Sequence, residues 1–286
     1  FNVSLNNKII SLIIIKKKYH FFWRVSMRQF HNKCNFIFLC LFFTFFSLSA
    51  EEFKYQFKKD DIYRLLTTIN EDVFLNGNKN HTTEIVNRIS VEITEVDETG
   101  TGKHKASHMV SETALFANGT QNQFSWGEEY QTEYSRDVYG FFDIAKTYFV
   151  PVVRNVPVFP KENVEIGDTW TANGSEVHDL RKNFSIEEPY EVPFLVRYTY
   201  KGIDTSVNPP LHIIQADYSM YYENPKIDNT TNTPISTMGY STQTLYWNNE
   251  NGTLDHYTER FRIVMETSLG DRIEYRGTSK TEITEL

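Results

Sequence analysis

Apolar and polar residues alternate along most of the chain after residue 60. In the run 85–94, one parity holds the apolar residues Ile85, Ile89, Val91 and Ile93, and the other holds the polar residues Arg88, Ser90, Glu92 and Thr94. The runs 256–265 and 272–276 alternate in the same way. Because successive side chains of a strand point to opposite sides of a sheet, each run predicts a strand with one buried face and one face in water.

Turn signals separate these runs. Asn76-Gly77, Asn118-Gly119 and Asn251-Gly252 are hairpin dipeptides, since both residue types tolerate a positive φ, and Gly270-Asp271 has the same part near the C-terminus. The segments between the turns have roughly 12–15 residues, well above the usual strand length of about 5–6. Strands are predicted at 53–58, 61–75, 80–96, 103–117, 121–134, 190–203, 210–222, 235–248, 253–268 and 272–285.

Long strands joined by tight turns predict an all-β fold, a long-stranded antiparallel meander that curls into a curved sheet, half-barrel or barrel. The middle of the chain differs. The segment 141–150 is a short helix or irregular, the prolines between 151 and 160 exclude a central strand, and 223–234 is a second loop. The domain 51–286 therefore divides into possible halves, 51–160 and 161–286, which form either one sheet or two subdomains.

The first fifty residues have the pattern of a targeting segment. Met27 is followed by basic residues, an apolar run over 36–46 and small residues that end at Ala50, which predicts a signal peptide over 27–50. Cleavage falls after Ala50 or after Ser49, and an uncleaved anchor is the alternative, although the run is short for a membrane span of about 20 residues. Residues 1–26 precede the first methionine, and we expect them to be an untranslated or non-native extension.

Charge and cysteine content exclude several functions for the body of the chain. Residues 1–50 contain seven basic and no acidic residues, so residues 51–286 hold 22 basic and 37 acidic residues, a net charge of −15. A body this acidic repels phosphate backbones, so no nucleic-acid partner is expected. Both cysteines, Cys34 and Cys40, lie in the first fifty residues, which excludes disulfides, thiolate metal sites and cysteine nucleophiles from 51–286.

Two motifs suggest metal or phosphate binding and fail on spacing. His104 and His108 share a face of the predicted strand but lie about 13 Å apart, too far to hold one metal ion. The loop 99–103, Thr-Gly-Thr-Gly-Lys, lacks the first glycine and the final serine or threonine of a phosphate loop, and a hairpin loop is the simpler interpretation. We expect no metal and no cofactor.

Two clusters suggest catalysis, each with a simpler alternative. Glu128, Glu129, Glu133 and Asp137 are interleaved with Trp126, Tyr130 and Tyr134, as in the carboxylate pairs and aromatic platforms of a glycosidase. Charged residues on an outward strand face explain the same pattern. The segment 176–181 brings together an acid, a histidine and an arginine, for which a structural ion-pair network is the alternative to a triad.

Two stretches resemble a known family. They are 150–170, VPVVRNVPVFPKENVEIGDTW, and 61–90, DIYRLLTTINEDVFLNGNKNHTTEIVNRIS. Both resemble the N-terminal (pre-OmpA) region of spirochaete envelope proteins of the treponemal OmpA family. In physical terms, Pro160 ends an extended segment, Gly167-Asp168 forms a tight turn and Trp170 enters the next strand as a core anchor.

The resemblance implies a periplasmic or outer-membrane-associated protein whose C-terminal OmpA-like domain holds peptidoglycan. No segment of this sequence corresponds to that domain, so peptidoglycan binding is not carried over, and whether the chain is a fragment of a longer protein stays open. The pre-OmpA region has no catalytic residues to transfer.

The leading hypothesis is a non-enzymatic envelope protein, exported to the periplasm or outer membrane and membrane-associated at most through its signal segment. Its partners are envelope components, namely lipid, peptide or protein, and its concave aromatic face either packs a core or holds an apolar ligand. Candidate ligand-binding residues are Trp126, Tyr130, Tyr198, Tyr200, Tyr221, Tyr222 and Trp247. The alternatives are a structural or interaction module for a missing OmpA-like peptidoglycan-binding domain, and a secreted hydrolase.

Overall fold

Residues 50–116, 118–224 and 232–286 are described by a computed structural model of the chain. Ala50–Leu286 forms one compact unit. The predicted extension over 1–26 and the predicted signal peptide over 27–50 lie outside the described residues, except for Ala50.

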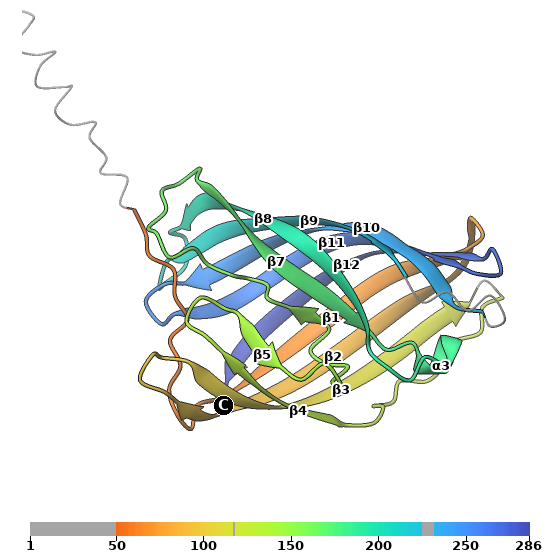
Figure 1. Ribbon diagram of the computed structural model, residues 1–286, viewed down its shortest axis with the longest axis horizontal. Coiled ribbons are helices and arrows are strands. Elements are labelled where there is room, and N and C mark those ends of the chain that lie inside the picture. Colours follow the sequence, from red (N-terminus) through yellow and green to blue (C-terminus); the bar gives the residue numbers. More distant parts are fainter. Residues whose placement is uncertain (1–49, 117, 225–231) are drawn as a thin grey trace, which may run out of the picture. The chain divides into compact units, whose positions relative to one another are not determined.

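Within the described residues, twelve strands form a single antiparallel sheet, as the alternation predicts (Figure 1). The strand order is β5-β4-β3-β2-β1-β12-β11-β10-β9-β8-β7-β6. The strands are β1 (Ile62–Leu75), β2 (Asn78–Val96), β3 (Gly102–Phe116), β4 (Tyr130–Arg136), β5 (Phe142–Ile144), β6 (Val153–Arg154), β7 (Thr169–His178), β8 (Tyr190–Asp204), β9 (Leu211–Glu223), β10 (Pro234–Asn248), β11 (Thr253–Thr267) and β12 (Arg272–Glu285).

The first and last long strands pair with each other. Thirteen residues of β1, from Tyr63 to Leu75, are in antiparallel register with β12. This pairing joins the N-terminal and C-terminal meanders into one sheet, so the two halves that the sequence suggested are not separate layers.

The sheet curls into a nearly closed barrel, and its two edges are short (Figure 1). Edge strand β5 has three residues and edge strand β6 has two. They are not neighbours in the ladder, but the amide of Phe142 donates to Oδ1 of Asn155 at 2.8 Å across the seam. Short edges of this kind leave few unpaired backbone groups for another chain to pair with.

On the strands with regular alternation, apolar residues face inward and charged residues face outward. On β8 the inward residues from Tyr190 to Tyr200 are all buried, while Glu191, Arg197 and Lys201 point outward and are exposed. On β12, Ile273 and Tyr275 face inward, away from the arginines on either side of them. On these segments the alternation places apolar side chains in the interior and charged ones in water.

One end of the barrel is filled by the segment that precedes β1. Residues 52–58 form no strand, and Phe53 and Tyr55 are buried in the hydrophobic core. The Phe53 ring lies 5.2 Å from the Tyr200 ring, and the Tyr55 ring lies 4.8 Å from the Trp247 indole. We call residues 50–60 the N-terminal segment; it closes this end by packing aromatic rings rather than by extending the sheet.

Three expectations about secondary structure are wrong. The predicted strand at 53–58 is the N-terminal segment, the predicted strand at 121–134 is regular only from Tyr130, and the segment 141–150 contains β5. The expectation that the proline-rich stretch holds no central strand is confirmed, because β6 within it is an edge strand. Strand β7 and the short helix α3 (Arg181–Phe184), the one helix among the described residues, were not among the predicted elements.

Candidate functional site

The concave face of β2 and β3 is covered over one part and uncovered over another. Toward the end filled by the N-terminal segment, Val91, Ile93 and Ala106 face inward and are almost fully buried. Farther along β3, Val110 also has the inward parity, but 38% of its surface is exposed. An apolar inward residue left in water marks a part of the concave face that the core does not fill.

The covering side chains are absent from this part because the neighbouring segments end. Phe57 of the N-terminal segment packs on His104, with ring centroids 4.8 Å apart, and goes no farther along β3. Strand β4 pairs only with residues 102–108 of β3. Beyond that, single bridges from Ser111 to Trp126 and from Leu115 to Gln121 accompany β3. The inward residues of this region, the uncovered stretch, are Ile69, Glu71, Ile85, Asn87, Val110 and Glu112.

Two carboxylates belong to the uncovered stretch. Glu71 lies on β1 and Glu112 on β3, on either side of the inward residues of β2. Burial, and secondly the charge of Glu112, raise the pKa of Glu71 to about 7. Burial and both carboxylates raise the pKa of Tyr275, the inward residue of β12, to about 12. Among the described residues neither glutamate has a salt-bridge partner.

Polar atoms of β2 next to these carboxylates also lack partners. Thr83 is directly opposite Glu71 in the ladder, is 1% exposed, and its hydroxyl makes no hydrogen bond within the described part of the chain. Oδ1 of Asn87 and Nδ1 of His81 are also buried and have no hydrogen-bond partner within the described part of the chain. Buried polar groups are normally paired, so these three atoms leave hydrogen-bonding capacity unused beside the two carboxylates.

A second interior polar cluster is satisfied internally. The Tyr218 hydroxyl donates to Oε1 of Glu176 at 2.9 Å and contacts Oε1 of Glu259 at 3.4 Å. Ser241 donates to Oε1 of Glu259 at 2.5 Å, and Ser279 donates to Oε2 at 3.0 Å. Burial, and then the charges of both glutamates, raise the pKa of Tyr218 well above its ordinary value. This cluster links β7, β9, β10, β11 and β12 across the interior, so we interpret it as a structural hydrogen-bond network.

The seven aromatic residues expected to bind a ligand do not lie together. Tyr198, Tyr200 and Trp247 are fully buried in the core, and Tyr222 packs on Tyr190 at its margin with ring centroids 5.6 Å apart. Tyr221 has the outward parity and is 66% exposed.

The other two of the seven lie near the seam and on the outer surface. Tyr130 faces inward beside His108, and the Arg181 guanidinium lies 5.9 Å from its ring. Trp126 lies under the Arg88 guanidinium, 4.9 Å from it, on the outward face of β2. The structure forms no shared surface from these residues, and their binding role stays a prediction.

The two histidines of β3 are packing residues. Both point inward, as their strand parity predicts, and His104 stacks on Tyr134 with ring centroids 4.9 Å apart. Nε2 of His108 lies 3.0 Å from the Thr132 hydroxyl. Burial lowers the pKa of each imidazole to about 4, so both are neutral at physiological pH.

The two clusters considered for catalysis are divided between the surface and the interior. Glu128, Glu129 and Glu133 are exposed, and Asp137 accepts the amides of Tyr139 and Phe141 in a turn. In the segment 176–181, Glu176 points inward, whereas Asp179 forms an exposed salt bridge with Arg181 at 2.6 Å. The loop 99–103 is a hairpin turn in which the Asp97 carboxylate accepts the amides of Thr99 and Thr101.

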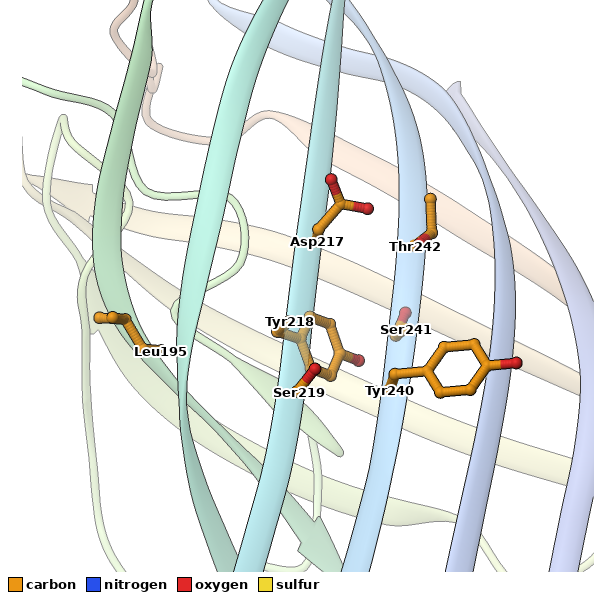
Figure 2. Close-up of a pocket in the computed structure, with 7 residues that line it drawn as sticks. All are labelled: Leu195, Asp217, Tyr218, Ser219, Tyr240, Ser241 and Thr242. Atoms are coloured by element: carbon orange, nitrogen blue, oxygen red, sulfur yellow. The ribbon is translucent and has the colours of Figure 1, made fainter.

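The outward face has an open hollow of about 340 Å³ between β8, β9 and β10. Figure 2 shows its lining, with Asp217 and Ser219 from β9 and Tyr240 and Thr242 from β10. Tyr218 and Ser241 contribute only from the far side, since their polar groups belong to the interior cluster. The hollow has no titratable pair and no apolar depth, so it suggests no chemistry.

No group of three or more histidine, cysteine, aspartate or glutamate side chains in residues 50–286, leaving out 117 and 225–231, is placed to hold a metal ion. The same part of the chain contains no helix with the length and apolar character that crossing a membrane requires.

No protein-family model and no curated protein matches the chain. Two solved structures are similar at a low level. OccK7 (OpdD) of Pseudomonas aeruginosa is 6% identical, with a TM-score of 0.23 over 80% of this chain and 100% of the other. The monoaromatic hydrocarbon channel CymD is 8% identical, with a TM-score of 0.25 over 80% of this chain and 89% of the other. Scores this low carry no argument about function.

Proposed function

We propose that the chain is a non-enzymatic protein of the bacterial cell envelope whose uncovered stretch binds an apolar ligand that bears a cationic group. The observation that carries the proposal is the coincidence, on one concave face, of the exposed inward Val110 with Glu71 and Glu112, two carboxylates that have no salt-bridge partner in the described part of the chain. An apolar surface with a few converging polar groups is the usual composition of a small-molecule site.

Location in the periplasm, or at the outer membrane without crossing it, is part of the proposal. The signal-like segment 27–50 and the absence of cysteine from 51–286 support export. The outward faces of the long strands carry charges, such as Arg197 on β8 and Lys280 on β12. A barrel that spans a bilayer needs an outward apolar band, so charged outward faces favour a body surrounded by water.

On the resemblance of 61–90 and 150–170 alone, we also propose that the chain is the N-terminal module of an OmpA-family envelope protein. The test is the genomic reading frame past Leu286. A continuation into an OmpA-like domain supports this part, and a stop codon directly after Leu286 removes it without affecting the ligand proposal.

The ligand proposal is tested with two probes of equal chain length, dodecylamine and dodecanol. We expect saturable binding of dodecylamine, and weaker binding of dodecanol because it lacks the cation. Val110→Asp replaces the apolar surface of the uncovered stretch with a charge, and we expect it to weaken dodecanol binding at least tenfold. Leu115→Asp is the matched control, because Leu115 is on the same strand but has the outward parity and is half exposed.

Equal loss in both variants, or no binding of either probe by the unmodified chain, contradicts the proposal. Native mass spectrometry after gentle extraction from the envelope then checks for a co-purifying ligand. Its absence favours a structural or interaction module, for which the packed aromatic core around Trp247 is the supporting observation.

A further inference from the structure

A basic groove lies on the outward face, on the other side of the sheet from the uncovered stretch. Its volume is about 390 Å³, and β10, β11, β12, β1 and β2 contribute to it. Arg260 and Arg262 of β11 and Arg276 of β12 line it, and Tyr240 of β10 forms one wall. Three guanidinium groups in one groove are notable on a body with a net charge of −15.

A buried carboxylate holds two of these arginines in place. Glu274 has the outward parity but is only 2% exposed, because arginine side chains cover it. Its Oε1 accepts Nε of Arg262 at 2.6 Å and Nε of Arg276, and its Oε2 lies 3.1 Å from Nη1 of Arg272. Hydrogen bonds from Arg262 and Arg276 lower the pKa of Glu274 to about 2, so the carboxylate is charged throughout the physiological range.

The position of Glu274 explains how the fold tolerates two arginines directly opposite each other. Arg262 and Arg276 are register partners in the β11–β12 ladder, a placement that is destabilising unless it is compensated. Glu274 compensates it while binding each guanidinium through Nε. The four remaining N–H donors of each arginine make no hydrogen bond to any described residue.

The groove has an excess of positive charge. Asp72 is its one outward-facing acid, and it is paired with Lys79 at 2.6 Å. Arg260 is exposed and has no acidic partner among the described residues. Glu274 therefore offsets one of the four neighbouring arginines, and the N–H groups of Arg260, Arg262 and Arg276 are available for an oxyanion.

We propose that this groove is an anion site that binds a phosphoryl group. Arginine forks match phosphate oxygens in geometry, and a set of guanidiniums already oriented by Glu274 loses less conformational freedom on binding than unrestrained side chains. Tyr240 and the outward hydroxyl of Thr278 supply further polar contacts at the rim. The site is independent of the ligand proposed for the concave face.

Inorganic phosphate is the first probe, titrated at low ionic strength by calorimetry, because salt screens exposed charges. We expect saturable binding by the unmodified chain. Arg260→Gln removes one fork without touching Glu274 and should weaken binding about tenfold, the effect of losing about 1.4 kcal/mol. The control is Arg64→Gln, which makes the same charge change on the outward face of β1, where Arg64 pairs in register with Thr284, away from the groove.

No saturable binding, or equal weakening by Arg260→Gln and Arg64→Gln, overturns the proposal. A second arm separates two sources of the phosphoryl group. Co-sedimentation with phosphatidylglycerol vesicles, competed by phosphate and absent with phosphatidylcholine, assigns a lipid headgroup. Binding of phosphate without co-sedimentation assigns a free phosphate compound, and either result supports the anion site.

Discussion

Two glutamates on neighbouring strands have opposite effects on stability because they face opposite sides of the sheet. Glu274 faces outward into arginines, which favour its charged form, and its pKa falls to about 2. Glu71 faces inward without a cation, and its pKa rises to about 7. The environment, rather than the residue type, therefore decides whether each carboxylate stabilises the folded state at neutral pH.

Glu71 makes the unfolding free energy depend on pH between about 4.5 and 7. In this window the folded state holds a proton on Glu71 that the unfolded state has lost, so the contribution of Glu71 to stability falls as the pH rises. His104 and His108, with pKa values of about 4 in the folded state, add a contribution that rises with pH up to about 6.5, and they do so in the unmodified chain and in the variant alike. The difference in unfolding free energy between Glu71→Gln and the unmodified chain therefore isolates Glu71, and it should grow between about pH 4.5 and 7 to about 1–2 kcal/mol in favour of the variant at pH 8. Urea unfolding of both proteins at several pH values measures it.

The matched control is Glu84→Gln, because Glu84 is on β2, has the outward parity and is exposed. We expect it to keep the pH dependence of the unmodified chain. If Glu71→Gln keeps that dependence as well, the interior position assigned to Glu71 is wrong.

At the scale of elements, the N-terminal segment is held by its side chains more than by its backbone. Phe53 contacts Phe159, Tyr200 and His212, with ring centroids 5.2 to 5.6 Å away. The backbone of the N-terminal segment makes a single bridge, between Glu51 and Val164, and scattered hydrogen bonds such as that from the Tyr55 amide to the Val138 carbonyl at 2.8 Å. Truncating the rings should therefore loosen this end of the barrel.

Phe53→Ala should lower the unfolding free energy by about 3–5 kcal/mol, the usual cost of removing a buried phenylalanine. Phe124→Ala is the comparison, since Phe124 is 54% exposed and should cost well under about 1 kcal/mol. Chemical denaturation of both variants measures the difference. Similar costs for the two would mean that the N-terminal segment does not fill the core.

The sequence predicted the long strands from regular apolar alternation or from turn signals at their ends. Strand β8 is predicted within a residue or two because its alternation is regular. Strand β12 is predicted because Gly270-Asp271 marks its start, although Gly277, Ser279 and Thr281 face inward on it. Strand β7 has Gly174, Glu176 and His178 among its inward residues, so its alternation is hidden. The N-terminal segment has strand-like alternation, but its aromatic rings fill the interior and it joins no ladder.

The candidate site was hidden for a related reason. Ile69, Glu71 and Val73 share one parity, so an acid at a core parity was visible in the sequence. What could not be seen was that Glu112, two strands away, joins it, because this depends on the register of β1, β2 and β3. The aromatic residues could be identified in the sequence. Which of them pack together could not, because that depends on the curl of the whole sheet.

At the scale of the whole molecule, one curled sheet separates three chemistries. The aromatic core fills one end, the acidic uncovered stretch lies on the concave face of β1–β3, and the arginine groove lies on the outward face of β11 and β12. Because β1 pairs with β12, the acidic uncovered stretch and the arginine groove lie on opposite faces of adjoining strands. The barrel therefore has an interior that is partly core and partly accessible surface.

The most direct test of this account is the labelling of single cysteines on β3. With Cys34 and Cys40 replaced by serine, the chain has no other thiol. Val110→Cys and Ala106→Cys lie on the same face of the same strand, one in the uncovered stretch and one under the core. The account predicts rapid reaction of a water-soluble maleimide at position 110 and strong protection at position 106. Equal rates at the two positions, with the chain folded, would contradict it.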